Sequence, residues 1–174
     1  PYPQEQFKVY GPLIKLPRVC EHKKIKYFYK FRTMHPYAEY IQQYVFDARG
    51  GMDIADKSND DWRITTWGRF MRKYWLDELP MLINWIKRDM KLVGVRPISK
   101  TMFDTYPEWL QEKRTLCKPG LIPPFYIDHP KTFDELFASE DKYLTEYLAH
   151  PFRTDVKYFF LTMWSILTRK THSA

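Results

Sequence analysis

Alternating apolar and charged positions near the start of the chain predict a β-strand. From Ile25 to Met34, bulky apolar side chains alternate with Lys26, Lys30 and Arg32. A period of two residues is typical of a half-exposed strand, and it places the three cations on one face of that strand.

In the middle of the chain, apolar residues recur at helical spacing. Between Pro80 and Arg88 this spacing predicts a helix with a buried stripe on one side and polar residues towards the other side. The stripe consists of Met81, Leu82, Trp85 and Ile86, and the polar side consists of Asn84, Lys87 and Arg88.

Two longer helices are predicted in the last third of the chain. Phe133 to Leu148 has the pattern of a charged helix, and Thr154 to Thr168 predicts a second helix with nearly continuous apolar faces. Packing in the core is the preferred explanation of that second helix, and docking at a membrane interface is the alternative. The apolar, proline-rich segment from Leu116 to Tyr126 predicts a pocket wall or a lipid-facing surface.

Together these segments predict a single α+β domain over residues 1–174, rich in helix, with a small β element near Ile25 to Met34. A loop with Gly50-Gly51 and the polar run from Asp56 to Asp61 would join the strand to the helices. One face of the domain, bearing Ile122 to Tyr126 and the last helix, is expected to meet a membrane.

Composition adds an expectation about partners. The 174 residues include 28 Lys and Arg against 21 Asp and Glu, which gives a net charge of +7. Such an excess favours polyanionic partners, of which nucleic acid, phosphorylated metabolites and anionic lipid all qualify. Aromatic residues make up 18% of the chain, more than a small core needs, so some rings are expected at an interface.

Two adjacent carboxylates, Asp77 and Glu78, stand in an apolar run just before Pro80. Carboxylates resist burial because their charged form loses hydration, so a cation, a helix terminus or a reaction must account for this pair. One interpretation is a metal-assisted site, in which one carboxylate attacks or accepts a proton and the other holds a divalent cation. The other interpretation is helix capping, and this segment by itself favours capping.

No apolar run reaches the roughly 18 residues of a membrane-spanning helix, so the chain as given is not expected to cross a membrane. It opens with Pro1-Tyr2-Pro3, which suggests a fragment or a processed product of a longer chain. Cys20 and Cys117 lie far apart and in no metal-ligand spacing, which fits a reducing, cytosol-facing location.

The order of motifs along most of the chain resembles the bacterial sugar transferases, which are monotopic polyprenyl-phosphate phosphoglycosyl transferases. The motifs are Tyr29-Lys30-Phe31-Arg32-Thr33-Met34, Arg63-Ile64-Thr65 with Gly68-Arg69 and Arg72, Leu76-Asp77-Glu78-Leu79-Pro80 with Ile83-Asn84, Asp89-Met90, Leu92-Val93-Gly94 with Arg96-Pro97, and Lys118-Pro119-Gly120. Each motif by itself is weak, but their order and spacing are specific.

The resemblance implies transfer of a sugar 1-phosphate from a nucleoside diphosphate sugar, usually a UDP-sugar, to undecaprenyl phosphate at the cytoplasmic face of the bacterial inner membrane. UMP leaves, and the lipid-linked product starts a surface polysaccharide or glycoconjugate. On this resemblance Asp77 is the nucleophile that forms a covalent phosphosugar intermediate, and Glu78 helps to bind magnesium. The residues expected to hold phosphate or to shape the site are Lys30, Arg32, Arg72, Arg96 and Pro97.

The chain departs from the family pattern at two motifs. Gly94-Val95-Arg96-Pro97 stands where the family commonly has Gly-Pro-Arg-Pro, and Pro119-Gly120-Leu121-Ile122-Pro123 where it commonly has Pro-Gly-Ile-Thr-Gly. The family's N-terminal membrane-penetrating helix is absent from this sequence, and its removal upstream is the expected reason. Three residues compete for the family's C-terminal acidic position, namely Glu140, Asp141 and Glu146.

Two other classes of function stay open at this point. Basic charge interleaved with aromatic rings from Lys23 to Arg32 would suit a nucleic-acid-binding module, although no nucleic-acid partner is expected. Aromatic surfaces and a basic C-terminal end would suit a noncatalytic scaffold that docks on anionic lipid. The sequence leaves open the sugar, the nucleotide, the pathway and the oligomeric state.

Overall fold

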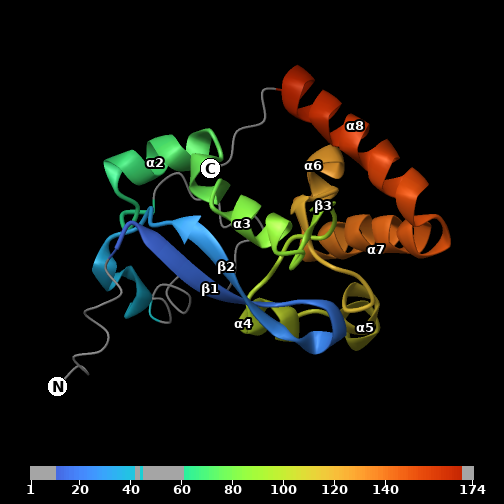
Figure 1. Ribbon diagram of the computed structural model, residues 1–174, viewed down its shortest axis with the longest axis horizontal. Coiled ribbons are helices and arrows are strands. Elements are labelled where there is room, and N and C mark those ends of the chain that lie inside the picture. The colour runs from blue at the N-terminus through green and yellow to red at the C-terminus, as the bar shows by residue number, and fades with distance from the viewer. Residues whose placement is uncertain (1–10, 42–43, 45–60, 170–174) are drawn as a thin grey trace.

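A β-hairpin opens the described part of the chain (Figure 1). The computed structural model describes residues 11–41, 44 and 61–169. In it β1 (Leu13–Val19) pairs antiparallel with β2 (Ile25–Phe31), and Leu13 lies opposite Phe31. The strand predicted from the alternating pattern is confirmed as β2. The sequence did not reveal β1, because Pro17 within it argues against a strand, although an edge strand tolerates proline.

The cations of β2 lie on its interior face. Lys26 and Lys30 share a face with Phe28, which is only 1% exposed, whereas Tyr27 on the opposite face is exposed. The prediction that these cations share one face is confirmed for Lys26 and Lys30. Arg32 lies just beyond the end of the strand.

Several short helices, two longer helices near the C-terminal end and two further strands are the other regular elements of the described chain. In chain order the elements are η2 (Glu21–Lys23), η3 (Pro36–Glu39), α2 (Thr66–Lys73), η4 (Leu76–Glu78), α3 (Met81–Ile86), β3 (Lys91–Val93), α4 (Lys100–Asp104), α5 (Glu108–Arg114), β4 (Gly120–Ile122), α6 (Phe125–Asp128), α7 (Phe133–Ala149) and α8 (Pro151–Arg169). β3 and β4 are parallel. Figure 1 shows α2 and α3 beside the hairpin, and α7 and α8 at the other end. This mixture of helices and small sheets confirms the predicted helix-rich combination of α and β structure.

Two groups of buried side chains form the core. The larger group lies among β3, α5, α7 and α8, and includes the fully buried Tyr143. The smaller group lies beneath the hairpin and joins Phe28 to Met81 of α3. Cys20 belongs to the smaller group and Cys117 to the larger, and both are buried free thiols. The hairpin is therefore packed onto the start of α3.

The buried stripe predicted between Pro80 and Arg88 is wrong. Met81 is buried, but Leu82, Trp85 and Ile86 are exposed, and Ile86 keeps 74% of its surface. Asn84, which was predicted on the polar side, is fully buried. The apolar side of α3 is thus left uncovered among the described residues.

Hydrogen bonds to the hairpin explain why Asn84 is buried. Its side-chain oxygen accepts from the backbone N–H of Tyr29 at 3.0 Å, and its Nδ2 donates to the carbonyl oxygen of Tyr27 at 2.8 Å. These groups lie at the edge of β2 that does not face β1, and buried backbone polar groups require partners. The amide of Asn84 therefore satisfies two backbone groups of β2 that a third strand would otherwise bind.

The preference for core packing of the apolar residues on α8 is confirmed only in part, since Tyr158 lies in the core and Phe159 packs against it. The buried side of this helix carries Thr154, Tyr158, Thr162 and Ser165. Phe160, Trp164 and Leu167 are exposed, and Trp164 keeps 69% of its surface. The small buried side chains let α8 pack closely on α6 and α7, so the larger apolar ones face outward. Among the described helices, none combines the length and the apolar content needed to cross a bilayer.

Beyond Leu116, which is exposed, the proline-rich segment offers little outer surface. It forms β4 and the start of α6, and Pro123, Pro124 and Tyr126 are buried. The expectation that Ile122 to Tyr126 forms a membrane-facing surface is therefore wrong. These side chains instead pack beneath the neighbouring elements.

Most of the predicted loop after the strand, including Gly50-Gly51, lies outside the described residues. Its last residue, Asp61, is described and buried. The carboxylate of Asp61 accepts a hydrogen bond from Nε of Arg63 at 2.8 Å. Asp61 therefore belongs to a buried ion pair and not to a solvated loop.

Candidate active site

The acidic pair lies on a short turn between two helices. η4 holds Asp77 and Glu78, follows α2 and is separated by Leu79 from Pro80, the N-cap of α3. Trp75 has a left-handed backbone with φ of 55°, which is uncommon for a bulky residue. Its indole N–H donates to the hydroxyl of Tyr126 at 3.1 Å. This contact ties η4, which carries the acidic pair, to α6.

Glu78 is held as an anion by two cations from distant segments. Nζ of Lys30 donates to Oε1 of Glu78 at 2.6 Å, and Nη2 of Arg96 donates to the same oxygen at 3.2 Å. Burial opposes the negative charge, but Lys30 and Arg96 outweigh it and lower the pKa of Glu78. Glu78 therefore stays ionised, and the positive charges of Lys30 and Arg96 balance its negative charge.

Asp77 differs from its neighbour. Its side chain is buried, and its Oδ1 has no hydrogen-bond partner among the described residues. Burial raises the pKa of Asp77, although Lys30, Arg72 and Arg96 act in the opposite direction. A buried carboxylate oxygen without a partner is unfavourable and requires an explanation. The two environments push the pKa values of adjacent carboxyl groups apart, as different chemical roles require.

The end of the hairpin orients Arg72. Nε of Arg72 donates to the Thr33 hydroxyl at 3.0 Å, and the Thr33 carbonyl oxygen accepts from the Thr65 backbone N–H at 2.9 Å. Gly68 lies so close that an added Cβ would come within 2.0 Å of that carbonyl oxygen. The close contact of Gly68 with Thr33 fixes the position of α2 and therefore of Arg72. The positive charge of Arg72 acts on both Asp77 and Glu78.

Gly68→Ala is expected to reduce stability by about 1–3 kcal/mol, because the added methyl group overlaps backbone atoms and forces α2 away from Thr33. Urea unfolding measures this loss. Gly11→Ala is the matched control, because no atom of the described residues lies within 4 Å of a Cβ at that position. Equal unfolding free energies of the two variants would contradict the close contact at Gly68.

A buried ion pair supports the segment that carries Arg96 and Pro97. Nη2 of Arg114 donates to the backbone carbonyl oxygen of Arg96 at 2.7 Å, and Nη1 pairs with the carboxylate of Glu140. Arg114, Glu140 and Pro97 are buried. Sequence reasoning did not assign a role to Arg114, since no motif singled it out.

The three candidates for the family's C-terminal acid occupy different environments. Asp141 pairs with Lys113, and Glu146 pairs with Lys157, in both cases with partly exposed side chains. Glu140 is the buried one, and through Arg114 it is connected to the segment of the site that carries Arg96.

The structure brings Lys30, Arg72 and Arg96 around the acidic pair, and it places Arg32 elsewhere. Nε of Arg32 donates to the carbonyl oxygen of Gly11 at 3.2 Å, next to the start of β1. The phosphate-binding roles assigned to these residues stay predictions.

A small cavity opens next to Glu78. Its charged lining residues are Arg18, Lys30, Glu78 and Arg96, and its apolar lining includes Phe28 and Leu121. Leu121 belongs to the proline-rich segment, so the predicted pocket wall is confirmed. Sequence reasoning missed Arg18, because β1 was not recognised as a strand facing the site.

The acidic pair could hold a metal ion together with ligands from a substrate. Among the residues that the structure describes, no three His, Cys, Asp or Glu side chains are grouped to bind a metal. Mg²⁺ commonly binds one or two carboxylates and takes its other ligands from water and phosphate. The ion pairs of Glu78 use Oε1, and Oδ1 of Asp77 is unpaired, so carboxylate oxygens fit such a site.

The chain is similar to a known protein family and to several named proteins. A family model described as bacterial sugar transferase matches residues 6–169. The chain is 34% identical over 161 residues to the galactosyl transferase CpsE of Streptococcus agalactiae, which is 90% of this chain and 35% of that protein. It is 38% identical over 108 residues to the undecaprenyl-phosphate galactose phosphotransferase of Salmonella typhimurium, which is 60% of this chain and 22% of that protein.

A third relative is the UDP-glucose:undecaprenyl-phosphate glucose-1-phosphate transferase of Caulobacter vibrioides. The identity is 36% over 94 residues, or 53% of this chain and 31% of that protein. The chain therefore matches between 22% and 35% of the length of these three relatives.

Proposed function

The chain belongs to the bacterial sugar transferase family, and on this basis we propose that it transfers a sugar 1-phosphate from a nucleoside diphosphate sugar to undecaprenyl phosphate. Two of the relatives are named for transfers to undecaprenyl phosphate, and one of these for UDP-glucose as donor. A UDP-sugar is therefore the proposed donor and UMP the leaving product. The lipid-linked diphosphosugar would start a surface polysaccharide or glycoconjugate.

Asp77 is the proposed nucleophile. Its carboxylate oxygen attacks the phosphorus bonded to the sugar, the bond from this phosphorus to the bridging oxygen breaks, and UMP leaves with the electron pair. An oxygen of undecaprenyl phosphate then attacks the same phosphorus, and the bond to Asp77 breaks to restore the carboxylate. The observation that supports the proposal is the buried Oδ1 of Asp77, which has no hydrogen-bond partner among the described residues and lies next to a Glu78 whose negative charge Lys30 and Arg96 balance.

Lys30, Arg72 and Arg96 would hold the diphosphate, because its negative charge otherwise repels the attacking carboxylate. Their positive charges act on both acids of the pair, and Lys30 and Arg96 also line the cavity next to Glu78. Glu78 would hold Mg²⁺ through the oxygen that its ion pairs leave available. Bound magnesium would neutralise charge on the phosphate oxygens and so favour attack at phosphorus.

Release of UMP tests this function. The protein, bound to lipid vesicles, is incubated with a panel of UDP-sugars, with magnesium and undecaprenyl phosphate present or omitted. Repeated turnover that requires metal and lipid, and that occurs with a particular sugar, would support the proposal. Absence of release across the panel, from folded and membrane-bound protein, would contradict it.

The two other classes of function are less well supported. A noncatalytic scaffold or a nucleic-acid-binding module gives no reason for an unpaired carboxylate oxygen beside three cations. The relatives are named as transferases, which also favours the enzyme.

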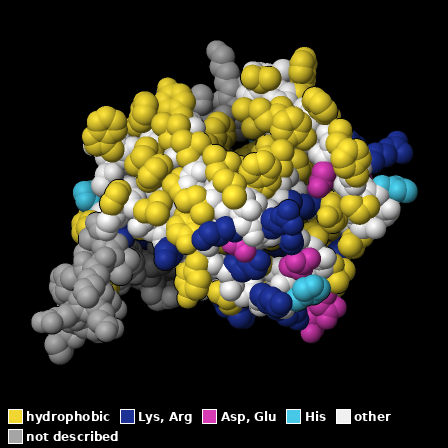
Figure 2. Space-filling view, viewed as in Figure 1, with side chains coloured by type: hydrophobic (Ala, Val, Ile, Leu, Met, Phe, Trp, Pro, Cys, Tyr) yellow, Lys and Arg dark blue, Asp and Glu magenta, His cyan; other side chains and the backbone are white. Residues whose placement is uncertain are grey.

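We also propose that the exposed apolar side of α2, α3 and α8 rests on the cytoplasmic face of the bacterial inner membrane. Figure 2 shows apolar side chains gathered over these helices and basic side chains along the lower margin of that patch. The apolar surface includes Trp67, Phe70, Trp85, Ile86, Trp164 and Leu167, and exposed basic residues at the ends of α2 and α3 are Lys73, Lys87 and Arg88. Aromatic and aliphatic side chains flanked by Lys and Arg suit an anionic lipid surface.

Trp164→Glu is expected to weaken binding to vesicles that contain phosphatidylglycerol about tenfold or more, because a large apolar contact is replaced by a charge that repels anionic lipid. Cosedimentation measures the binding. Trp109→Glu is the matched control, since Trp109 is 54% exposed but lies on α5, which Figure 1 shows away from α8. Equal loss of binding in both variants would contradict the proposed surface.

A further inference from the structure

We propose that Arg18 binds a phosphate group of a substrate other than the one that reacts with Asp77. The inference rests on the function proposed above and assigns a role to a further residue that lines the cavity next to Glu78. It concerns a strand and a residue to which no sequence motif drew attention. The chemistry recognised is a phosphate ester, which the leaving nucleotide and the lipid acceptor both contain.

Arg18 reaches the cavity from the interior face of the hairpin. The register of β1 and β2 places Arg18 opposite Lys26 and Ile14 opposite Lys30. Directly opposed residues of an antiparallel pair have their side chains on the same face, so Arg18 shares the face of Lys26 and Lys30. Arg18 and Lys30 both line the cavity next to Glu78.

The two cations enter the cavity at different points. From Ile14 to Arg18 the strand advances four residues, which is roughly 13 Å of strand length, and apolar side chains such as Phe28 lie between. Lys30 is tied to the reacting end by its ion pair with Glu78. Arg18 is thus placed to meet a group that lies further along the cavity.

The second phosphate is negatively charged like the first, so it also needs a positively charged partner in the cavity. The donor brings a leaving phosphate next to the reacting one, and the acceptor brings a phosphate of its own. The lining cations are Lys30, Arg96 and Arg18, and the first two contact Glu78 at the reacting end. A guanidinium group can bind two phosphate oxygens through parallel hydrogen bonds, so the third cation suits the second phosphate.

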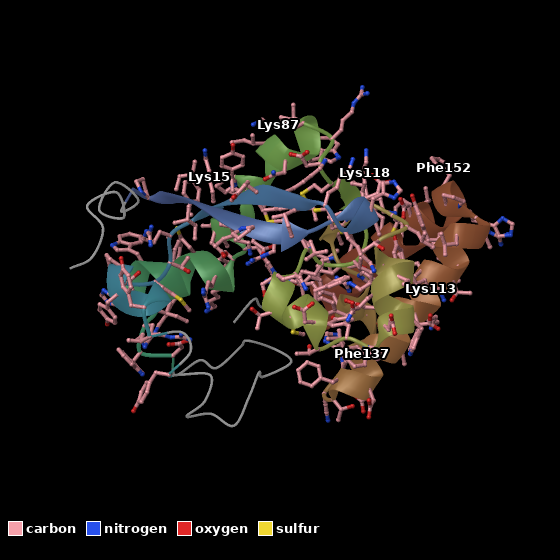
Figure 3. The ribbon with its side chains drawn as sticks, turned by 90° about the horizontal axis from the view of Figure 1, so that it is seen from below. Lys15, Lys87, Lys113, Lys118, Phe137 and Phe152 are labelled. Atoms are coloured by element: carbon pink, nitrogen blue, oxygen red, sulfur yellow. The ribbon has the colours of Figure 1, made fainter. Side chains whose placement is uncertain are left out.

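Lys15 provides a matched control on the same strand. It lies opposite Tyr29 in the register, and its Nζ is 5.6 Å from the centre of the Tyr29 ring. Nζ of Lys87 lies 5.1 Å from the same ring, and Figure 3 shows Lys15 and Lys87 on the outer side of the hairpin. Lys15→Ala removes one positive charge from β1 without altering the cavity lining.

The experiment compares Arg18→Ala, Arg18→Lys and Lys15→Ala with the wild-type enzyme in two assays. The first measures single-turnover UMP release against donor concentration without acceptor, and the second measures steady-state turnover against undecaprenyl phosphate. Arg18→Ala should raise the half-saturating concentration about tenfold to a hundredfold in one assay, with a smaller increase for Arg18→Lys and none for Lys15→Ala. An increase in the first assay identifies the leaving phosphate, and an increase in the second identifies the acceptor phosphate.

Titration with inorganic diphosphate gives a readout that needs no turnover. Arg18→Ala protein with the wild-type unfolding midpoint should bind this probe about tenfold more weakly than Lys15→Ala protein. Unchanged half-saturation in both assays, together with equal diphosphate binding by the two variants, would overturn the role of Arg18. Wild-type protein that binds diphosphate through Arg18 but never releases UMP would instead contradict the proposed function.

Discussion

Asp77→Asn is expected to reduce steady-state UMP release by about four orders of magnitude or more, because the variant loses the oxygen that attacks phosphorus. Asparagine keeps the size of the side chain, and Oδ1 of Asp77 has no hydrogen bond among the described residues that the change could break. The fold should therefore persist. A discontinuous UMP assay at saturating donor and acceptor measures the loss.

A surface aspartate supplies the control for this variant. Asp104 pairs with Lys100 on the exposed side of α4, and Asp104→Asn removes the same charge without approaching the site. Its rate should match that of the wild-type protein. Intact-protein mass after incubation with donor should rise by one sugar phosphate in the wild type and not in Asp77→Asn. Turnover that survives in Asp77→Asn would contradict the assignment of the nucleophile.

Glu140→Gln should lower the free energy of unfolding by about 3–5 kcal/mol, the usual consequence of leaving a buried charge without its partner. Arg114 and Glu140 are both buried, and burial of the guanidinium of Arg114 is compensated by this carboxylate. Urea unfolding with a fluorescence readout measures the change. Because Arg114 also holds the Arg96 carbonyl oxygen, turnover should fall in protein that is still folded.

Glu146→Gln is the matched control for Glu140→Gln. Glu146 lies on the same helix, α7, and pairs with Lys157 through partly exposed side chains. Pairs of this kind contribute about 0–1 kcal/mol, so the control should unfold almost like the wild-type protein. Similar losses in the two variants would show that the Arg114–Glu140 pair does not have the stabilising role that its burial implies.

The sequence identified much of the candidate site through ordered motifs. Lys30 and Arg96 lie 48 and 18 positions from Glu78 in the chain, and the structure brings both within ion-pair distance. Charge pattern by itself could not have shown this proximity, since it arises from packing of the hairpin against η4 and α3. Arg18 was missed for the same reason, because its position depends on the register of a strand that contains Pro17.

Helical periodicity was informative about α3 and α8 but did not reveal which side is covered. It shows which residues share a side of a helix, while the neighbouring elements decide which side is buried. In α3 the amide of Asn84 satisfies backbone groups of β2, and this outweighs burial of Trp85 and Ile86. On α8 the small residue Thr162 permits a close approach to neighbouring helices, which a large apolar side chain would prevent.

The place of η4 between α2 and α3 bears on how the acceptor is found. The acidic pair stands on the turn that joins two helices with exposed apolar sides. On the proposed function, the protein rests on lipid through these helices and the acceptor is held in the same bilayer by its prenyl chain. Both then diffuse within one plane, and the bilayer raises the effective concentration of each for the other. The mole fraction of acceptor in the membrane, and not its amount in the whole sample, then governs how often the two meet.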